Sequence, residues 1–323
     1  MEFFRQTKTI NFMGQSKIAI AVSIVLVLIS WGILAAKGLN YGIDFAGGTI
    51  VQVKYEGAAP IDTVRDTLAT NPLYEGAQIT EFGSPEEIII RLKTSSKDVQ
   101  SDMGDVTREA LKGTGSFEVR RVDIVGPKVG GELREKGVMA MLLAILGILI
   151  YVAVRFEWRF AVASIAALIH DVSIAMGAIS LFAIDVNLDV LAALLTLLGY
   201  SLNDTIIVFD RIREGVTASK SIELADVINE SVTKTLSRTT LTSLTTFFVV
   251  LTLFMFGGEI IHAFAFTLLV GIIVGTYSSI FVASPILMWF GFNVGNYRTK
   301  LAEAARRRAE KEKMRSMYEQ GTV

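Results

Sequence analysis

An acidic side chain lies inside a long apolar segment of the sequence. Residues 190–209 are predominantly apolar, and Asp204 stands within them. An ionisable residue in a membrane span costs roughly 2.5–3.5 kcal/mol on insertion scales, and such residues usually handle ions or protons with a partner nearby. The sequence therefore predicts that Asp204 handles protons and that another span supplies its partner.

The partner predicted for Asp204 is Arg238. Asp204 precedes Arg211 by seven residues, which places it about 10 Å inside the end of its helix. Arg238 opens the next apolar segment from the same side. At ~4 Å and an effective dielectric constant of about 20, the pair would gain roughly 4 kcal/mol of Coulomb energy, which offsets much of the insertion cost. We therefore predict that Asp204 and Arg238 together carry proton transport.

Polar side chains accompany both charges at spacings that place most of them on the same helical faces. They can hold water and extend the path of a proton. Alternatively, their hydroxyls bond to helix carbonyls, and the small residues Gly199 and Ser201 only allow close helix packing. The candidate accessory residues on these two segments are Tyr200, Ser201, Asn203, Thr242 and Thr245.

A second ionisable pair, His170 and Asp171, lies in the apolar segment 160–184. His170 follows Arg159 by eleven residues, about 16 Å along a helix and thus near the middle of a membrane. Adjacent residues point about 100° apart on a helix, so they cannot both face one partner, and one of them can simply pack against a neighbouring helix. An accessory role in the polar path and a structural role therefore both stay open.

Two further groups of residues have mainly structural explanations. Asp210, Arg211 and Arg213 stand at the water boundary, where a solvated charge cluster is expected, although a functional role stays open. Two glycine-rich stretches predict tight turns on either side of a polar region, and the first lacks the Lys-Ser or Lys-Thr of a P-loop. Their turn residues are Gly42, Asp44, Gly47, Gly48, Gly126 and Pro127.

The composition places these residues in a membrane protein. The 323 residues are 51% hydrophobic and only 20% charged, and the mean hydropathy is +0.49, unlike a soluble domain. There is no cysteine and there are two histidines, so we expect no disulfide and no metal site. For a membrane subunit of this kind we also expect no cofactor and no enzymatic activity. Six segments are long enough to span about 30 Å of hydrocarbon, namely residues 18–36, 138–154, 160–184, 190–209, 237–256 and 262–290.

The distribution of charge predicts how the spans are oriented. The connections at residues 185–189 and 257–259 contain acids and neither Lys nor Arg. Both termini are therefore expected in the cytoplasm and residues 37–137 in the periplasm. A cleaved signal peptide at residues 18–36 is less favoured, because the segment is long and lacks a clean A-x-A site. The basic segments, all on one side of a six-span arrangement, are residues 1–17, 155–159, 210–236 and 291–323.

Residues 37–137 predict one small domain outside the membrane. Alternating apolar residues indicate strands, and a proline at a helix start and turn residues between strands separate the elements. Their order, β-α-β-β-α-β, is that of a ferredoxin-like sandwich. The expected fold class is an α-helical membrane protein with six transmembrane helices and one periplasmic α+β ferredoxin-like domain between the first two. The expected elements are residues 49–55, 60–69, 77–82, 87–93, 98–112 and 117–125.

Two segments outside the spans are expected to be helical. The loop 210–236 predicts a separate amphipathic helix, because four apolar residues fall on one face, namely Ile222, Ala225, Ile228 and Val232. Its acidic character favours packing against the protein over contact with an anionic membrane. The basic tail 291–323 is expected to be a solvated helix, with anionic lipid or a ribosome as alternative contacts.

Several motifs stand in order along almost the whole chain, namely residues 42–49, 125–127, 156–159, 170–171, 199–214 and 237–239. Together they resemble the SecD/SecF family of protein-export membrane proteins in the RND superfamily. The resemblance implies an RND-type half that pairs with a separate SecD subunit and associates with the SecYEG channel and YajC. It also implies use of the proton motive force to move unfolded exported polypeptides across the bacterial inner membrane, with sodium as an alternative ion.

The resemblance carries implications for single residues and for other partners. Asp204 and Arg238 match the transport acid and the basic residue of the family. We expect membrane lipids around the spans and no nucleic-acid partner. Two other functions stay open. A small-molecule or lipid exporter of the superfamily usually carries two six-span halves in one chain. The second alternative is a structural subunit that only stabilises a channel complex and does not couple an ion gradient to transport.

Overall fold

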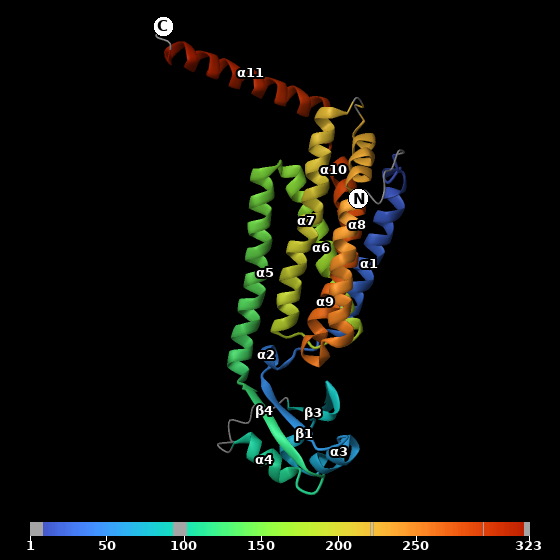
Figure 1. The fold of residues 1–323 in the computed structure, drawn as a ribbon, viewed down its shortest axis with the longest axis vertical. Helices are drawn as coiled ribbons and strands as arrows, with labels where there is room; N and C mark the ends of the chain where they lie inside the picture. Colours follow the sequence, from blue (N-terminus) through green and yellow to red (C-terminus); the bar gives the residue numbers. More distant parts are fainter. Residues whose placement is uncertain (1–8, 93–101, 220, 222, 293, 320–323) are drawn as a thin grey trace.

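The chain forms a helix bundle with a small sheet domain against one of its ends (Figure 1). The structure, a computed structural model, describes residues 9–92, 102–219, 221, 223–292 and 294–319. Within these residues, six helices are long and apolar enough to cross a membrane. The sheet domain is inserted between the first and the second of them. The expected six-span fold class with one sheet domain is therefore confirmed.

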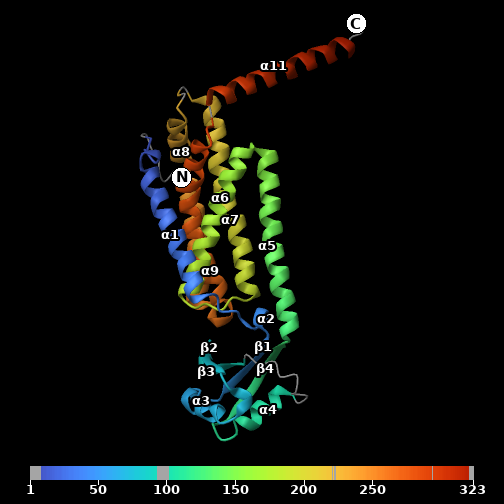
Figure 2. The same ribbon diagram turned by 180° about the vertical axis from the view of Figure 1, so that it is seen from behind.

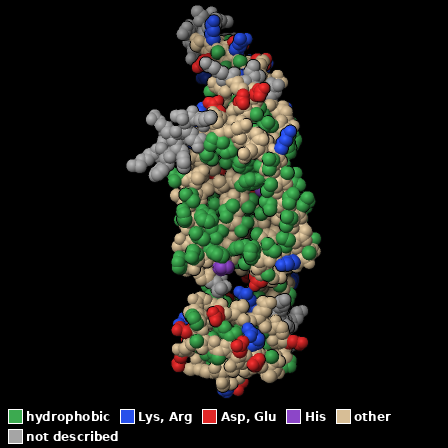
Figure 3. All heavy atoms as spheres, turned by 90° about the vertical axis from the view of Figure 1, so that its right-hand side faces the viewer, with side chains coloured by type: hydrophobic (Ala, Val, Ile, Leu, Met, Phe, Trp, Pro, Cys, Tyr) green, Lys and Arg blue, Asp and Glu red, His purple; other side chains and the backbone are tan. Residues whose placement is uncertain are grey.

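The bundle presents an apolar belt to its surroundings. Figure 3 shows hydrophobic side chains over its middle and charged side chains towards the ends of the molecule. α6 and α7 are the most buried spans, whereas α1, α5 and α8 expose most of their apolar residues. The spans are α1 (Ser16–Lys37), preceded by η1 (Met13–Gln15), then α5 (Pro127–Arg155), α6 (Trp158–Leu181), α7 (Leu188–Ala218), α8 (Leu224–Phe256) and α9 (Gly258–Ser278).

The last span changes its helical geometry half-way. After α9 the backbone forms a π-helical turn, η3 (Ser279–Ala283), and then continues as α10 (Ser284–Trp289). Pro285 lies in the first turn of α10. Because proline has no N–H, it cannot donate to the carbonyl of Phe281 within the π turn. Such π turns inside α-helices are frequent at functional sites.

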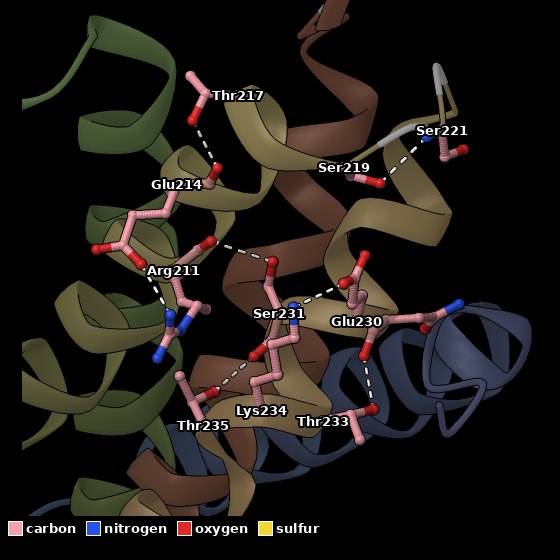
Figure 4. Close-up of polar contacts among 11 residues, drawn as sticks. Arg211, Glu214, Thr217, Ser219, Ser221, Glu230, Ser231, Thr233, Lys234 and Thr235 are labelled. Carbon is pink, nitrogen blue, oxygen red and sulfur yellow. Dashed lines mark hydrogen bonds and ion pairs between the residues drawn. The ribbon is translucent and has the colours of Figure 1, made fainter. Parts of the chain in front are cut away.

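The connection between α7 and α8 differs from the expected one. The predicted separate amphipathic helix is instead the beginning of α8, because Ile228 and Val232 continue the apolar face of the span and pack into the same core. Figure 4 shows polar contacts across this joint, where the hydroxyl of Ser231 donates to the carbonyl of Arg211 at 3.2 Å. Ile222, which belongs to the predicted apolar face, lies outside the described residues.

The tail forms the helix α11 (Val294–Glu319), which projects away from the bundle at the end opposite to the sheet domain (Figure 2). Arg298 fixes its first turns, because the guanidinium donates to the carbonyls of Val216 and Ser219 at the end of α7, at 2.5 and 2.6 Å. The described side chains beyond these turns are exposed. The tail is therefore a helix, as expected, and its contacts with lipid or other partners stay a prediction.

The sheet domain has the expected order of elements. They are β1 (Gly48–Tyr55), α3 (Ile61–Ala69), β2 (Gln78–Phe82), β3 (Ser84–Leu92), α4 (Met103–Ala110) and β4 (Phe117–Val125), with a short η2 (Pro72–Tyr74). The strands pair antiparallel in the order β2-β3-β1-β4. Val51 and Val53 alternate with half-buried residues along β1 and join the core of the domain. Residues 93–101, which contain the end of the third predicted strand and the start of the second predicted helix, lie outside the described residues.

A short loop joins the sheet domain to the α6–α7 connection. It contains the single turn α2 (Ile43–Ala46). The N–H of Gly42 donates to the carbonyl of Val186 at 2.8 Å, and the Asp44 carboxylate accepts the N–H of Leu188, at the start of α7, at 3.0 Å. From β3, Arg91 forms an ion pair with Asp185 at 3.0 Å. The sheet domain is therefore held against the beginning of α7.

Two consecutive glycines make this joint sterically feasible. Gly47 has φ +77° and ψ 161°, a region that is essentially restricted to glycine. A Cβ on Gly47 would lie 2.8 Å from Cα of Pro127, and one on Gly48 would lie 2.4 Å from the carbonyl oxygen of Leu92. Gly126 differs, because its φ is −68° and no atom lies within 4 Å of an added Cβ.

We expect Gly47→Ala to destabilise the protein and Gly126→Ala to leave its stability nearly unchanged. The first substitution adds backbone strain of about 1–3 kcal/mol and a clash with Pro127, whereas the second adds neither. Thermal unfolding of the purified variants in detergent measures the difference. Equal melting temperatures would show that the close approach at Gly47 relaxes without cost.

Candidate ion-handling site

Asp204 lies in the middle of α7 and faces the interior of the bundle. It is 3% exposed. One carboxylate oxygen, Oδ2, accepts the hydroxyl of Ser243 on α8 at 3.2 Å. Ser243 in turn accepts the hydroxyl of Thr276 on α9 at 2.8 Å. The other oxygen of the carboxylate, Oδ1, has no hydrogen-bond partner within the described residues. Three helices therefore meet at a carboxylate that is only half satisfied.

Two more buried hydroxyls lie close along the same helices. Thr205, next to Asp204, and Thr239, one turn before Ser243, are 1% and 2% exposed. Neither hydroxyl has a hydrogen-bond partner in the described part of the chain. Buried polar groups normally find partners, and ordered water is a common one. The buried parts of α7 and α8 near Asp204 therefore contain oxygen atoms that ordered water could satisfy.

Arg238 does not form the direct ion pair that the sequence predicted. Its side chain is exposed, and among the described residues no hydrogen bond or ion pair joins it to Asp204. The reason is rotational, because the face of α8 towards the bundle interior carries Thr239 and Ser243. A residue adjacent to Thr239 is turned about 100° away from that face. Arg238 thus lies on the surface of the bundle, five residues before Ser243, which binds the acid.

The predicted accessory residues do not gather around Asp204. Ser201 donates to Asp171 instead, and the Tyr200 hydroxyl bonds to Thr246 of α8. Asn203 and Thr245 are exposed and Thr242 is half-buried, and the two threonines back-bond to carbonyls of their own helix, which was the structural alternative. None of these three side chains contacts Asp204 in the described structure, and their role in a polar path stays a prediction.

His170 and Asp171 form a separate buried site. Nδ1 of His170 lies 2.8 Å from Oδ1 of Asp171, so the two neighbours contact each other, which the sequence argument did not anticipate. Oδ2 of Asp171 accepts the hydroxyls of Ser201 on α7 at 2.5 Å and of Ser278 on α9 at 2.8 Å. This second carboxylate is thus satisfied by hydroxyls from two neighbouring helices.

The boundary residues form the expected charge cluster. Arg211 pairs with Glu214 at 2.9 Å and Arg213 with Asp210 at 3.7 Å, all within α7. Arg213 also donates to the carbonyl of Arg155 at the end of α5. The Asp210 and Arg211 side chains are each 44% exposed, so the cluster is solvated. Through Arg213 it also connects the ends of α7 and α5.

The sequence did not indicate Ser243, Thr276, Thr205 or Thr239 as site residues. The available signal was that Thr239 and Ser243 are four residues apart within an apolar span, which places two hydroxyls on one helical face. No cluster of three or more potential metal ligands of the His, Cys, Asp or Glu type occurs within the described residues.

These features define a multi-pass α-helical membrane protein with two carboxylates buried between its central helices and one ferredoxin-like domain beside the bundle. The model of "Protein export membrane protein SecD/SecF, C-terminal" matches residues 106–293. That of the "SecD/SecF GG Motif" matches residues 32–59, which include the glycine joint at Gly47 and Gly48. The chain belongs to the SecD/SecF family.

Curated relatives cover the chain from end to end. It is 48% identical over 323 residues to the protein translocase subunit SecF of Helicobacter pylori strain J99, with 100% of both chains covered. It is 48% identical to the SecF subunit of Calditerrivibrio nitroreducens, with 89% of this chain and 96% of that protein covered. It is 46% identical to the SecF subunit of Vibrio alginolyticus, with 90% and 92% covered.

Solved structures show the same fold within a longer chain. The crystal structure of SecDF from Thermus thermophilus, a translocon-associated membrane protein, has a TM-score of 0.78 and 39% identity over 89% of this chain. SecDF in its super-membrane-facing form has a TM-score of 0.67 and 38% identity over 94% of this chain. The chain spans only 39% and 41% of the length of those two chains.

We expect Ser243→Ala to destabilise the bundle more than Thr252→Ala does. Ser243 connects Asp204 to Thr276, and its loss leaves the buried Asp204 carboxylate without a partner, at about 1–3 kcal/mol, whereas Thr276 still donates to the carbonyl of Ile272. Thr252 is exposed on the same helix and only back-bonds to Phe248. Thermal unfolding in detergent compares the two variants. Equal losses would mean that water replaces the Ser243 hydroxyl.

Proposed function

We propose that this chain is the SecF-type accessory subunit of a bacterial protein-export complex. In this proposal it pairs with a SecD-type subunit and acts beside the SecYEG channel, with YajC as a further partner. Together with SecD, it uses the proton motive force to complete translocation of secreted polypeptides across the inner membrane. Full-length similarity to translocase subunits named SecF supports this proposal. So does the similarity to SecDF, in which this fold makes up about two fifths of a longer chain.

The observation that carries the proposal is the state of Asp204. Its carboxylate is buried in an apolar bundle, held through one oxygen by a hydroxyl and left open at the other. A purely structural acid at this depth would be expected to have a fixed partner for both oxygens. A group that takes up and releases a proton instead needs one oxygen free to be protonated.

The cycle proposed for Asp204 couples protonation to movement of α7. A proton that crosses a potential of 100 mV releases about 2.3 kcal/mol. Protonation from outside and deprotonation towards the cytoplasm would alter the contacts of α7 with α8 and α9 in turn. The other end of α7 begins at the joint where Leu188 donates to Asp44, so a shift of this helix would reach the sheet domain. Arg238 approaches Asp204 in only part of the cycle and then lowers the cost of its charge.

In the proposed orientation, the termini lie in the cytoplasm and the sheet domain in the periplasm. The basic helix α11 lies at the end opposite to the sheet domain (Figure 1). α7 begins beside the sheet domain, so the boundary cluster of Asp210, Arg211 and Arg213 near its other end lies on the far side as well. The positive-inside rule places that end in the cytoplasm. The sheet domain is then on the side where an emerging polypeptide is held.

We expect Asp204→Asn to abolish the gradient-dependent part of export. The amide keeps the size of the side chain and can bond to Ser243, but it cannot exchange a proton. Translocation of a secreted reporter into inverted inner-membrane vesicles that hold the complete complex, with and without an imposed proton gradient, measures this effect.

The matched control is Asp189→Asn, which removes an exposed carboxylate at the start of the same helix. It is expected to export like the unmodified chain. If Asp204→Asn assembles normally and still responds to the gradient, the coupling role is refuted and a structural subunit remains. A response to a sodium gradient alone would replace the proton with sodium as the coupling ion.

A further inference from the structure

His170 and Asp171 form a buried dyad that the proposed function leaves unused. The side chains are 6% and 0% exposed, and Nδ1 of the imidazole lies 2.8 Å from Oδ1 of the carboxylate. Because a carboxylate only accepts hydrogen bonds, Nδ1 is the protonated nitrogen in this contact. The place where the ring can gain or lose a proton is therefore its other nitrogen, Nε2.

Nε2 of His170 is buried and has no hydrogen-bond partner within the described residues. A histidine kept only to fix helix packing would be expected to use both nitrogens, because an unsatisfied buried polar atom lowers stability. The carboxylate beside it is held firmly, since Oδ2 of Asp171 accepts hydroxyls from Ser201 at 2.5 Å and Ser278 at 2.8 Å. One half of the dyad is thus fixed, and the other half is open.

We propose that His170 and Asp171 form a second proton-binding site, separate from Asp204, in which Nε2 of the imidazole takes up and releases the proton. With the proton bound, an imidazolium faces a carboxylate and the dyad is neutral. When the proton leaves Nε2, a neutral imidazole still donates Nδ1–H to Asp171, and the dyad carries one negative charge. Asp171 keeps its three hydrogen bonds in both states.

The surroundings contain few other titratable groups. Tyr277 of α9 stacks on the imidazole with ring centroids 6.2 Å apart, and its hydroxyl donates to the carbonyl of Ala19 on α1. Asp204 is the nearest acid along α7, three residues after Ser201. η3 and α10 carry no ionisable side chain. The charged residues of the other packed helices lie towards their ends, namely Lys17 and Lys37 on α1 and Lys128, Glu132, Arg134, Glu135, Lys136 and Arg155 on α5.

The dyad shares two helices with the Asp204 site. On α7, Ser201 donates to Asp171 of the dyad, and Asp204 lies about one helical turn further along the same helix. On α9, Thr276 donates towards Asp204 through Ser243, while Ser278 donates to Asp171. The π turn η3 begins at the next residue, Ser279. A change of charge at one site therefore acts on the same two helix segments that hold the other site.

The test is histidine-selective nuclear magnetic resonance of the full chain in lipid nanodiscs. The chain contains only two histidines, so His262→Gln assigns both signals. We expect the ring signals of His170 to change with pH as Nε2 gains and loses its proton. Asp171→Asn should move the midpoint by roughly one to three pH units. His262, whose ring packs against Phe254 at 4.3 Å near the other end of α9, should not respond to Asp171→Asn.

Ser201→Ala is a milder second variant, because it removes only one of the donors to Asp171. It should shift the same titration by a smaller amount, so the proposal stays testable even if Asp171→Asn does not fold. A His170 signal that is constant over the whole pH range, or a midpoint that neither variant moves, would overturn the proposal.

The resonance experiment requires no export activity, so its outcome does not depend on the proposed function. Only the further claim that the proton bound by His170 is used in transport rests on that function. In the Asp204→Asn variant, His170 should still titrate, even though gradient-driven export is lost. If the proton bound by His170 is used in transport, His170→Gln should reduce gradient-dependent export severalfold, while His262→Gln should leave it unchanged. Full export with His170→Gln would refute the use of this proton in transport.

Discussion

The central constraint on this molecule is that a carboxylate buried between apolar helices can bond only to groups that its neighbours bring to it. Asp204 and Asp171 obtain these groups as hydroxyls, from α8 for the first and from α7 and α9 for the second. A hydroxyl is short, so the backbones must come close. Gly275 on α9 allows this, because a Cβ there would lie 3.1 Å from Cβ of Ser201. The close approach of α9 to α7 at Gly275 thus brings the hydroxyls within reach of Asp171.

The sequence was sufficient for the architecture because the fold depends on local patterns. Uninterrupted apolar length indicates a span, and the alternation along β1 indicates a strand with one buried face. The boundary of α8 was misjudged for the same reason. Its apolar face continues from the span through Val232 and Ile228 without a break, so no local signal separates a surface helix from the start of the span.

The partners within the site were beyond a sequence argument because they depend on how neighbouring helices are rotated and shifted. Ser201 and Asp204 are three residues apart and were assigned to one face. They point about 60° apart, which is enough for Ser201 to reach α6 and for Asp204 to reach α8. Likewise, the sequence argument used depth along the helix to place Arg238 near Asp204. Whether the two side chains meet depends on the direction in which Arg238 points from α8. Sequence periodicity identifies the buried side of a helix and not which neighbour occupies it.

The choice of hydroxyls over a fixed arginine partner has a consequence for transport. A tight ion pair would hold Asp204 in its charged form and would resist proton uptake. A hydroxyl can donate to a carboxylate and can equally accept from a carboxylic acid by rotating about its own bond. Ser243 and Thr276 can therefore serve both protonation states of Asp204 without repacking of the helices. In the proposed cycle, these hydroxyls would keep Asp204 hydrogen-bonded in both protonation states, so a movement of α7 would have to come from the change of charge itself.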